Sequence, residues 1–399
     1  MLCYIYIFAY ILLNVYIILR TLRWFYYCHG IFGLWRFRIP YIITVGGMAS
    51  LVIIAFFLQE NGQHYRLEHF SSQWFGVLFY IIFYVAAADL IRLLMKVLKL
   101  TPKGFFEKGR FVFAGGLVVI ALIISTSIYG FIHVRDMKTV HYQANIEKSC
   151  EGIESLRIVL VADQHLGYTI GVKDMEKMAA KINAEKPDLV CIAGDIFDNN
   201  YNALDDPEGI RQAFKSIEST YGVYACWGNH DVKEPLFSGF SVNARSEAVR
   251  DPRMEQLLKD ADIQVLNDEA VSVDDKFYVI GRLDYEKAGD GTSNRKDIAR
   301  LTEGLDLSRP VIVIDHQPRE LEETAAAGVD IDLSGHTHGG QIFPMNLTNH
   351  LIWENGWGIM QKGNMYSVVT SGIGVYGPAM RVFTDSEVVV VDADFQPAS

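Results

Sequence analysis

The sequence predicts two parts of different fold class: a bundle of four transmembrane helices, followed by an α/β domain whose sheets are flanked by helices. Charge separates the two parts, because residues 1–140 contain 13 Lys and Arg against 5 Asp and Glu, whereas the rest contains 23 basic and 42 acidic residues. Apolar patterning separates them again, with long apolar stretches before residue 140 and short runs after it. We therefore expect a transmembrane region at 1–140 and a separate domain at 141–399.

Four apolar stretches have the length and composition of membrane spans, since about 20 mainly apolar residues cross a ~30 Å hydrocarbon core. They lie at residues 4–19, 41–58, 74–94 and 111–132. The first lacks the basic leader and the small-residue cleavage site of a signal peptide, so we expect it to be retained. In the third, Asp89 and Arg92 are three residues apart, and we expect a local ion pair between them.

The first and third links between these stretches are basic. Arg20, Arg23, Arg36 and Arg38 lie around the first link, and five Lys or Arg lie between residues 96 and 110 in the third. Because basic loops stay in the cytoplasm, both links are assigned to the inside. The fourth span then leaves the membrane on the outer side. The sequence thus predicts a multi-pass protein of the cell membrane with an extracytoplasmic C-terminal domain.

The second part alternates short apolar runs with helical patterns, which is typical of an α/β fold. Helices are expected at 171–186 and 208–219, and the late runs follow each other with less helix between them, which predicts a second sheet. The expected strands cover residues 156–162, 188–193, 223–227, 263–266, 277–280, 311–314, 331–333, 367–370 and 387–391.

Charge and cysteine content narrow the possible functions. The acidic second part would repel the phosphates of nucleic acids, so we expect no nucleic-acid partner. The five cysteines show neither CxxC spacing nor a disulfide framework. A thiolate metal site and a disulfide-stapled fold are therefore not indicated.

Polar residues cluster immediately after five of the expected strands, at the sheet edge where α/β proteins bind ligands. The clusters comprise Asp163 and His165, Asp195 and Asp198, Asn229 and His230, His316, and His336 and His338. Their oxygen and nitrogen atoms suit Mn, Fe or Zn, and are also compatible with Mg. A divalent metal is therefore expected at this edge.

Seven of these residues can bind metal, which exceeds the four ligands of one tetrahedral site, so the pattern predicts two ions with Asp195 as the bridging carboxylate. The pairs 163/165 and 336/338 are two residues apart, and on an extended strand end their side chains would point the same way. Two ions about 3.5–4 Å apart can stabilise both the attacking and the leaving oxygen of a displacement at phosphorus. His230, beside Asn229, is expected to stay off the metals and to protonate the leaving oxygen or stabilise the transition state.

The series of motifs over about residues 155–395 resembles the calcineurin-like metallophosphoesterase superfamily. The resemblance implies a two-sheet sandwich with a dinuclear centre at one edge, His230 as the catalytic histidine and Asp198 as a residue that orients it from outside the ligand set. It implies one ion held by Asp163, His165, Asp195 and His338, and a second held by Asp195, Asn229, His316 and His336.

The runs 334–341 and 370–374 look like the bacterial cell-envelope branch of this superfamily, whose members carry N-terminal membrane segments. Two positions depart from the usual pattern. Asp231 stands where many members have Glu, and Asp315 precedes His316 where small or apolar residues are usual. Asp315 either orients His316 or faces away from it.

The expected function is a membrane-anchored, two-metal phosphoesterase that hydrolyses a phosphomonoester, phosphodiester or pyrophosphate bond of a cell-envelope or lipid-linked substrate, with phosphodiesterase activity favoured. The alternative is a membrane sensor or transporter whose outer domain binds metal without turnover. No ligand of the motif series is missing, and the helices lack the charged relay of a transporter, which favours the enzyme. The aromatic segment 342–366 either caps the site, touches lipid or packs in the core.

Overall fold

The computed structural model describes residues 2–58, 62–102, 104–107, 109–237, 239–241, 248–292 and 294–396. The chain forms two compact units. The helical unit contains the described residues of 1–132, 235–243 and 377–380, and the α/β unit contains those of 133–234, 244–376 and 381–399.

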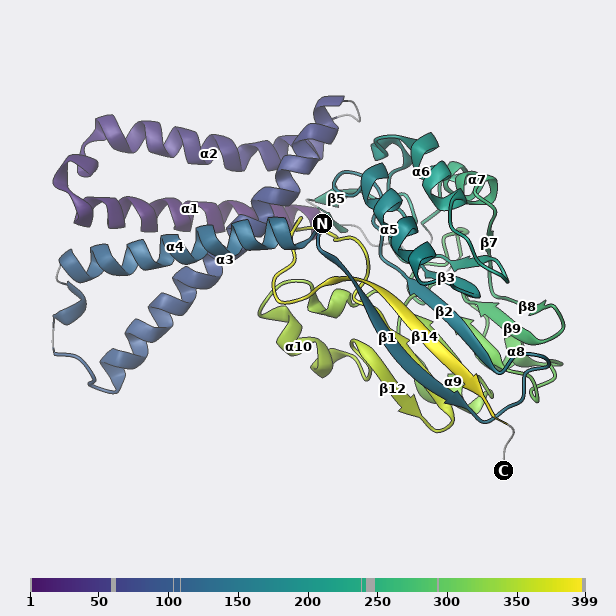
Figure 1. Ribbon diagram of the computed structural model, residues 1–399. Coiled ribbons are helices and arrows are strands. Elements are labelled where there is room, and N and C mark those ends of the chain that lie inside the picture. Colours follow the sequence, from purple (N-terminus) through teal and green to yellow (C-terminus); the bar gives the residue numbers. More distant parts are fainter. Residues whose placement is uncertain are drawn as a thin grey trace. The chain divides into compact units, whose positions relative to one another are not determined.

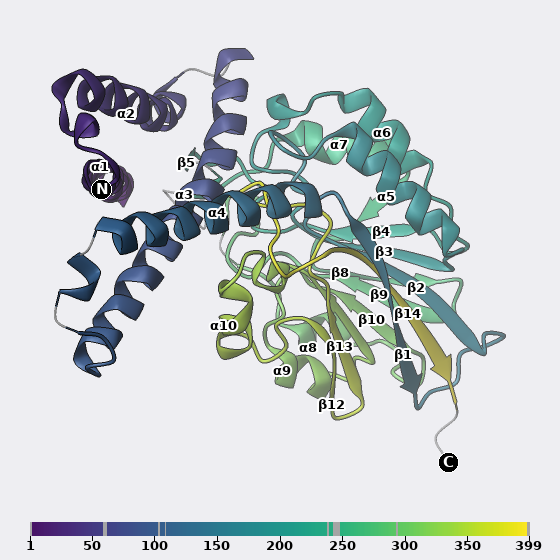
Figure 2. The ribbon, with the colours of Figure 1, turned by 60° about the vertical axis from the view of Figure 1, so that its left-hand side comes forward.

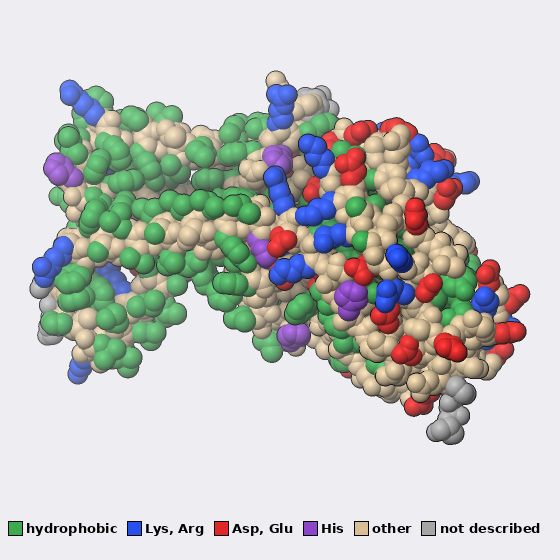
Figure 3. Space-filling model, viewed as in Figure 1, with side chains coloured by type: hydrophobic (Ala, Val, Ile, Leu, Met, Phe, Trp, Pro, Cys, Tyr) green, Lys and Arg blue, Asp and Glu red, His purple; other side chains and the backbone are tan. Residues whose placement is uncertain are grey.

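The helical unit is built from four long apolar helices (Figure 1). They are α1 (Leu2–Cys28), α2 (Trp35–Phe57), α3 (Gly62–Val97) and α4 (Gly109–His133). Each is long and apolar enough to cross a membrane, and apolar side chains cover their outer surface (Figure 3). Because helices satisfy their own backbone hydrogen bonds, such a surface is suited to lipid. The four expected stretches overlap these helices, which extend further at most of their ends.

The predicted pair between Asp89 and Arg92 is wrong. Asp89 instead accepts a hydrogen bond from Arg20 Nη2 at 2.6 Å, and Arg92 lies over the ring of Phe106 at 5.7 Å from its centroid. Arg20 belongs to α1 and Asp89 to α3, so the packing of two helices supplies the partner. The spacing of charges along one helix does not reveal such a contact.

A hairpin of β5 (Leu236–Phe237) and β6 (Phe240–Ser241) also belongs to the helical unit. The ring of Phe237 is buried against Tyr10, Phe56 and Phe75, with centroid distances of 5.7, 5.6 and 5.7 Å. Edge-to-face contacts of this kind add to the apolar area that aromatic rings bury. A hairpin that the sequence places after β4 is thus packed among residues of α1, α2 and α3.

The α/β unit contains two six-stranded sheets (Figures 1 and 2). The first sheet has the order β1 (Met137–Ile146), β14 (Ser386–Phe395), β2 (Ser155–Val161), β3 (Leu189–Ala193), β4 (Val223–Cys226), β7 (Ile263–Val265). The second sheet has the order β12 (Gly358–Lys362), β13 (Met365–Val369), β11 (Ile331–Ser334), β10 (Val311–Ile314), β9 (Phe277–Gly281), β8 (Glu269–Val273). The strands β2, β3, β4 and β7 are parallel, and so are β9, β10, β11 and β13.

The two sheets pack face to face, and helices cover their outer faces. Alternate residues such as Leu160 and Ile314 form the core between the sheets. Helices α5 (Val172–Ala184), α6 (Pro207–Lys215) and α7 (Pro252–Asp260) cover the first sheet, while α8 (Ile298–Thr302) and α9 (Leu321–Ala326) cover the second. The predicted fold class, a helix-flanked two-sheet sandwich after four long apolar helices, is confirmed.

All nine expected strands are present in the two six-stranded sheets, and the three other strands of these sheets were not expected. These three, β1, β8 and β12, lie at sheet edges. Edge strands keep one side in solvent and carry polar residues there, as in the burial pattern of β1, so their apolar signal is weak. The missed strands are therefore those whose pairing is visible only in the assembled sheet.

Candidate metal centre

The carboxyl ends of β2, β3, β4, β10 and β11 meet at one edge of the sandwich. The loops that follow these strands carry all seven expected ligands, and six of the seven are buried. Five of them have positive φ: Asp163 (55°), His165 (48°), Asp195 (50°), His336 (69°) and His338 (50°). Each such conformation costs about 1–2 kcal/mol in an L-residue. The expectation of an extended strand end is therefore wrong for both pairs, because their backbone is left-handed. Asp163 and His165 still offer ligand atoms to the same group, as expected.

One group of side chains joins Asp163, His165, His338 and Asp195. His165 Nε2 lies 3.1 Å from His338 Nε2 and 3.6 Å from Asp195 Oδ2. His338 Nε2 lies 3.6 Å from Asp163 Oδ1. Atoms that share an ion at about 2.0–2.2 Å are separated by such distances.

A second group surrounds His316. Its Nε2 lies 3.1 Å from Asn229 Oδ1, 3.1 Å from His336 Nδ1 and 3.2 Å from Asp195 Oδ2. Asp195 Oδ2 thus faces both groups, as expected of a bridging carboxylate. Together the two groups contain all seven predicted ligands, and Asp195 Oδ2 is the atom that connects them.

The donor set fits a cation at each group. His316 Nδ1 lies 2.9 Å from the carbonyl oxygen of Ala193 and donates to it, so Nε2 is the ring nitrogen that faces the site. Nε2 lies against two oxygen acceptors and another ring nitrogen, and a single N–H cannot satisfy all three. Acceptors that converge in a buried site are stabilised by a divalent ion, and nitrogen and oxygen donors suit a borderline metal.

The two carboxyl groups differ in their readiness to ionise. Burial raises the pKa of the Asp163 carboxyl to about 6. Burial also acts on Asp195, but the neighbouring His316, His230 and His165 outweigh it and hold the pKa of that carboxyl well below its usual range. Asp195 is therefore ionised in the folded protein, as a bridging ligand needs to be.

One ring nitrogen of His230 is held by a hydrogen bond within the protein. Its Nδ1 donates to Asn199 Oδ1 at 2.9 Å and lies 3.4 Å from Asp198 Oδ1, while its backbone N–H donates to Asp195 Oδ1 at 2.7 Å. Nε2 is the ring nitrogen left for a ligand. Asp198 Oδ1 also lies 3.7 Å from His165 Nδ1, so this carboxylate faces two rings of the site. Asn199 was not predicted, although it directly follows Asp198.

Buried polar groups hold the loops of the site. Asp231 accepts hydrogen bonds from the backbone N–H of Phe197 and of Gly228, both at 2.7 Å, and so joins the loops after β3 and β4. A side chain at Gly228 would collide with the Asp195 carboxylate. Lys287 Nζ donates to the carbonyl oxygen of Asn229 at 3.2 Å.

Arg381 holds the loop of His338 by donating hydrogen bonds to backbone carbonyl oxygens. Its Nη2 donates to the carbonyl oxygens of Ser371 and Gly374 at 2.6 and 2.7 Å and lies 3.5 Å from His338 Nδ1. The spacing of the motifs gave no indication of Arg381 or of Lys287, because each acts on loops distant in the sequence.

Asp315 faces away from His316. Its carboxylate pairs with Arg282 Nη1 and Arg295 Nη1, each at 3.0 Å. Of the two expected arrangements, the structure therefore has the one in which Asp315 does not orient the ligand.

Aromatic rings border the site. The ring of Tyr376 lies 4.9 Å from that of His338 and 6.0 Å from that of His230. The ring of Trp353 lies 5.2 Å from that of His336. The segment 342–366 therefore contributes one side chain, Trp353, that borders the site.

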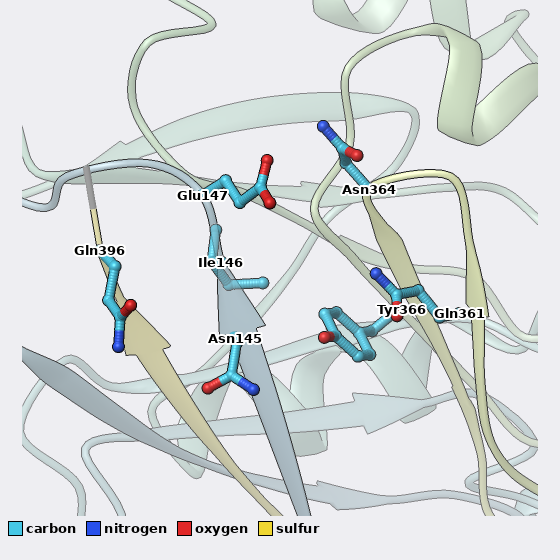
Figure 4. Close-up of a pocket in the computed structure, with 7 residues that line it drawn as sticks. All are labelled: Asn145, Ile146, Glu147, Gln361, Asn364, Tyr366 and Gln396. Carbon is cyan, nitrogen blue, oxygen red and sulfur yellow. The ribbon is translucent and has the colours of Figure 1, made fainter. Parts of the chain in front are cut away.

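A separate hollow lies at the opposite edge of the sheets (Figure 4). Its lining residues are Asn145, Ile146, Glu147, Gln361, Asn364, Tyr366 and Gln396. Tyr366 begins the pairing of β13 with β11, whereas the predicted ligands follow the carboxyl end of β11. The hollow is thus distant from the candidate metal centre and contains none of its residues.

A sandwich with clustered Asp and His side chains at the carboxyl ends of its strands has the architecture of a metal-dependent hydrolase. Residues 156–340 match the model of the family "Calcineurin-like phosphoesterase". The chain therefore carries a calcineurin-like metallophosphoesterase domain, and the resemblance seen in the motifs is confirmed.

Three relatives illustrate the range of similar proteins. An uncharacterized metallophosphoesterase of Campylobacter jejuni is 28% identical over 394 residues, which cover 96% of this chain and 95% of that protein. A transmembrane protein with metallophosphoesterase domain from Danio rerio is 27% identical, covering 88% and 79%. UDP-2,3-diacylglucosamine pyrophosphatase LpxG of Chlamydia trachomatis is 23% identical, covering 52% and 72%.

Proposed function

We propose that this protein is a membrane-anchored phosphoesterase that uses two divalent ions. The observation that carries the proposal is the position of Asp195 Oδ2, which lies 3.6 Å from His165 Nε2 and 3.2 Å from His316 Nε2. One ion would be held by Asp163, His165, Asp195 and His338, and the other by Asp195, Asn229, His316 and His336. Mn, Fe or Zn suits this donor set, and Mg is compatible with it.

The residues around the ions have separate tasks. When bound, two divalent ions would polarise the phosphoryl oxygens and activate water for attack at phosphorus. Because the Nδ1–H of His230 donates to Asn199, its Nε2 is the nitrogen that protonates the leaving oxygen. Asp198, at 3.4 Å from Nδ1, stabilises the positive charge of the protonated ring.

We further propose a lipid-linked substrate, cleaved at a phosphodiester or pyrophosphate bond. The name of the relative LpxG, a pyrophosphatase of a diacylated sugar nucleotide, supports this substrate class. So does α10 (Met345–Ile352), in which Leu347, Leu351 and Ile352 are 65%, 84% and 72% exposed. An exposed apolar surface of this kind is typical of a site that meets lipid or an apolar partner. Trp353, which borders the site, directly follows this helix.

The test is a substrate screen with the full chain in detergent and defined Mn, Zn or Mg. We expect metal-dependent hydrolysis of bis(p-nitrophenyl) phosphate, and faster hydrolysis of lipid-linked diphosphates than of p-nitrophenyl phosphate. Tight binding of metal without hydrolysis of any of these esters would favour the alternative, a membrane sensor or transporter with a non-catalytic domain.

We also propose that the catalytic domain is extracytoplasmic. Basic side chains gather at the end of the helical unit where α1 meets α2 and α3 meets α4 (Figure 3), and such ends stay in the cytoplasm. A single cysteine introduced by Asp290→Cys should react with an impermeant thiol reagent in intact cells. The control Lys99→Cys, in the link after α3, should react only after permeabilisation. The reverse pattern would refute this orientation.

A further inference from the structure

Arg319 is held rigidly on the loop between β10 and α9, three residues after His316. Its guanidinium carbon lies 4.6 Å from the ring centroid of Trp353 and 5.0 Å from that of Tyr285. Its Nε donates to Gln317 Oε1 at 2.8 Å. Stacking on two rings and one hydrogen bond fix the plane of the guanidinium, which lowers the entropy lost when it binds a ligand.

This guanidinium lies close to one half of the candidate metal centre. Trp353, on which it stacks, has its ring 5.2 Å from that of the predicted ligand His336. Gln317, to which it donates, directly follows the predicted ligand His316. One aromatic side chain thus contacts both a proposed metal ligand and a fixed positive charge.

The charge of Arg319 is weakly compensated, in contrast to the arginines nearby. Arg282 and Arg295 pair with Asp315 and Glu320 at 2.6–3.0 Å. Nη2 of Arg319 lies 3.7 Å from Glu286 Oε1, and the two side chains are 38% and 47% exposed. Exposed ion pairs of this kind are weak and contribute little to stability. Of the five guanidinium N–H groups, Gln317 uses one, so most of them can still bind a ligand.

We propose that Arg319 determines specificity by binding a second phosphoryl group of the substrate, which assigns the substrate to the diphosphates. This inference rests on the proposed function, which places the first phosphoryl group at the metal centre. A planar guanidinium binds two phosphate oxygens at once, and the adjoining phosphoryl group of a diphosphate extends from the metal centre toward its rim. In a strongly acidic domain, a weakly compensated guanidinium at this point attracts an anion.

The experiment measures binding, so that its result does not depend on turnover. Full-length protein in detergent is titrated by calorimetry with imidodiphosphate, a diphosphate that is not hydrolysed readily, and separately with orthophosphate, at a fixed concentration of free Mn²⁺. The variants are Arg319→Gln and the matched control Arg309→Gln. Arg309 is similarly exposed and lies over the ring of Tyr278, but it precedes β10 at the opposite end of the strand from His316.

Arg319→Gln should weaken imidodiphosphate binding about tenfold or more, because a charge-assisted hydrogen-bond pair is lost, and should change orthophosphate binding less than about twofold. Arg309→Gln should change neither. Equal imidodiphosphate affinity in the wild type and in Arg319→Gln would overturn the inference, and so would an equal loss for both anions. The melting temperature of Arg319→Gln shows whether the variant has a folding defect. Arg319→Lys, which keeps the charge, serves as the conservative variant for a recognition defect. If imidodiphosphate binding depends on Arg319 but no ester is hydrolysed, the proposed hydrolysis fails, and only the part of the inference that assigns a diphosphate-binding role to Arg319 stands.

Discussion

The two sheets of the α/β unit contribute different chemistry to the same site. The first sheet supplies both carboxylates, the amide and His165, whereas the second supplies only the imidazoles of His316, His336 and His338. Each proposed ion would take ligands from both sheets, and neither sheet alone offers a complete set. The difference indicates that the anionic ligands come from the first sheet alone, whereas both sheets supply neutral ligands, so that bound metal would also link the sheets.

The two sheets also differ in the buried polar residues that stabilise them. On the first sheet, Asp231 fastens two loops by accepting backbone hydrogen bonds. On the second, Asp315 forms a buried ion network with Arg282 and Arg295, and it faces away from the site. The comparison therefore predicts that changes in the first sheet affect chemistry, and that changes behind the second sheet affect stability.

The largest effect is expected at Asp195, the carboxylate shared by both groups. Asp195→Asn should remove binding of both ions and reduce hydrolysis to near the rate without added metal, because the anionic bridge is lost. Metal analysis and bis(p-nitrophenyl) phosphate assays measure this, with Asp394→Asn on β14 as a control. Two ions still bound with near-normal activity would contradict the dinuclear proposal.

His230→Ala tests the proposed general-acid role of the histidine that follows β4 in the first sheet. We expect metal content to persist and kcat to fall about 10²–10⁴-fold, the usual contribution of acid–base assistance. The loss should be smaller for nitrophenyl esters, whose leaving group needs little protonation, than for alkyl esters. A loss of equal size for both classes of ester would exclude a general-acid role.

Arg381→Lys tests whether the support of His338 reaches the metal. Lys keeps the charge but cannot donate to several carbonyl oxygens at once. We expect affinity for the first ion to fall about 10–100-fold, as for other partners of metal ligands. Calorimetric titration with Mn²⁺ measures this, and the melting temperature of the metal-free protein controls for misfolding. Unchanged affinity would show that Arg381 serves only the loop.

The smallest effect is expected at Asp332, buried in β11 of the second sheet. Burial, aided by Asp315, raises the pKa of its carboxyl from 3.8 to about 8, although Arg282 and Arg295 act in the opposite direction. The folded state then holds a proton that the unfolded state releases, so this group lowers stability as pH rises from about 4 to 8. Asp332→Asn should raise the melting temperature by about 2–4 °C or more at pH 8, and should have little effect near pH 4. A larger gain at pH 4 than at pH 8 would contradict this reasoning.

Candidate ligands that directly follow a buried strand could be predicted from the sequence. Asp163, Asp195 and His316 each follow a short apolar run, so strand and ligand appear together in one local pattern. Arg381 and Asn199 could not be predicted, because their partners are set by loops that meet only in the folded domain. The backbone of the ligands was also misjudged, since the positive φ angles at five of them follow from tight turns that alternation along a strand does not show.

The same limit applies to charge pairs and edge strands. Asp89 has a possible partner three residues away, yet its actual partner, Arg20, is on another helix. β1 has the mixed polar pattern of a strand with one side in solvent, and only its ten-residue pairing with β14 makes it a strand. Local patterns therefore predict core strands and candidate ligands, while contacts between distant segments require the assembled structure.

The place of β14 has a consequence for the synthesis of the protein. β14 lies between β1 and β2, although the ribosome makes it after every other described strand. β1, which begins four residues after α4 ends, therefore has no partner among the described strands until residues 386–395 have been made. A nascent chain stalled before Ser386 would expose the edges of both β1 and β2, and such edges promote aggregation. Synthesis of β14, more than formation of the four helices, then decides when the edges of β1 and β2 are covered.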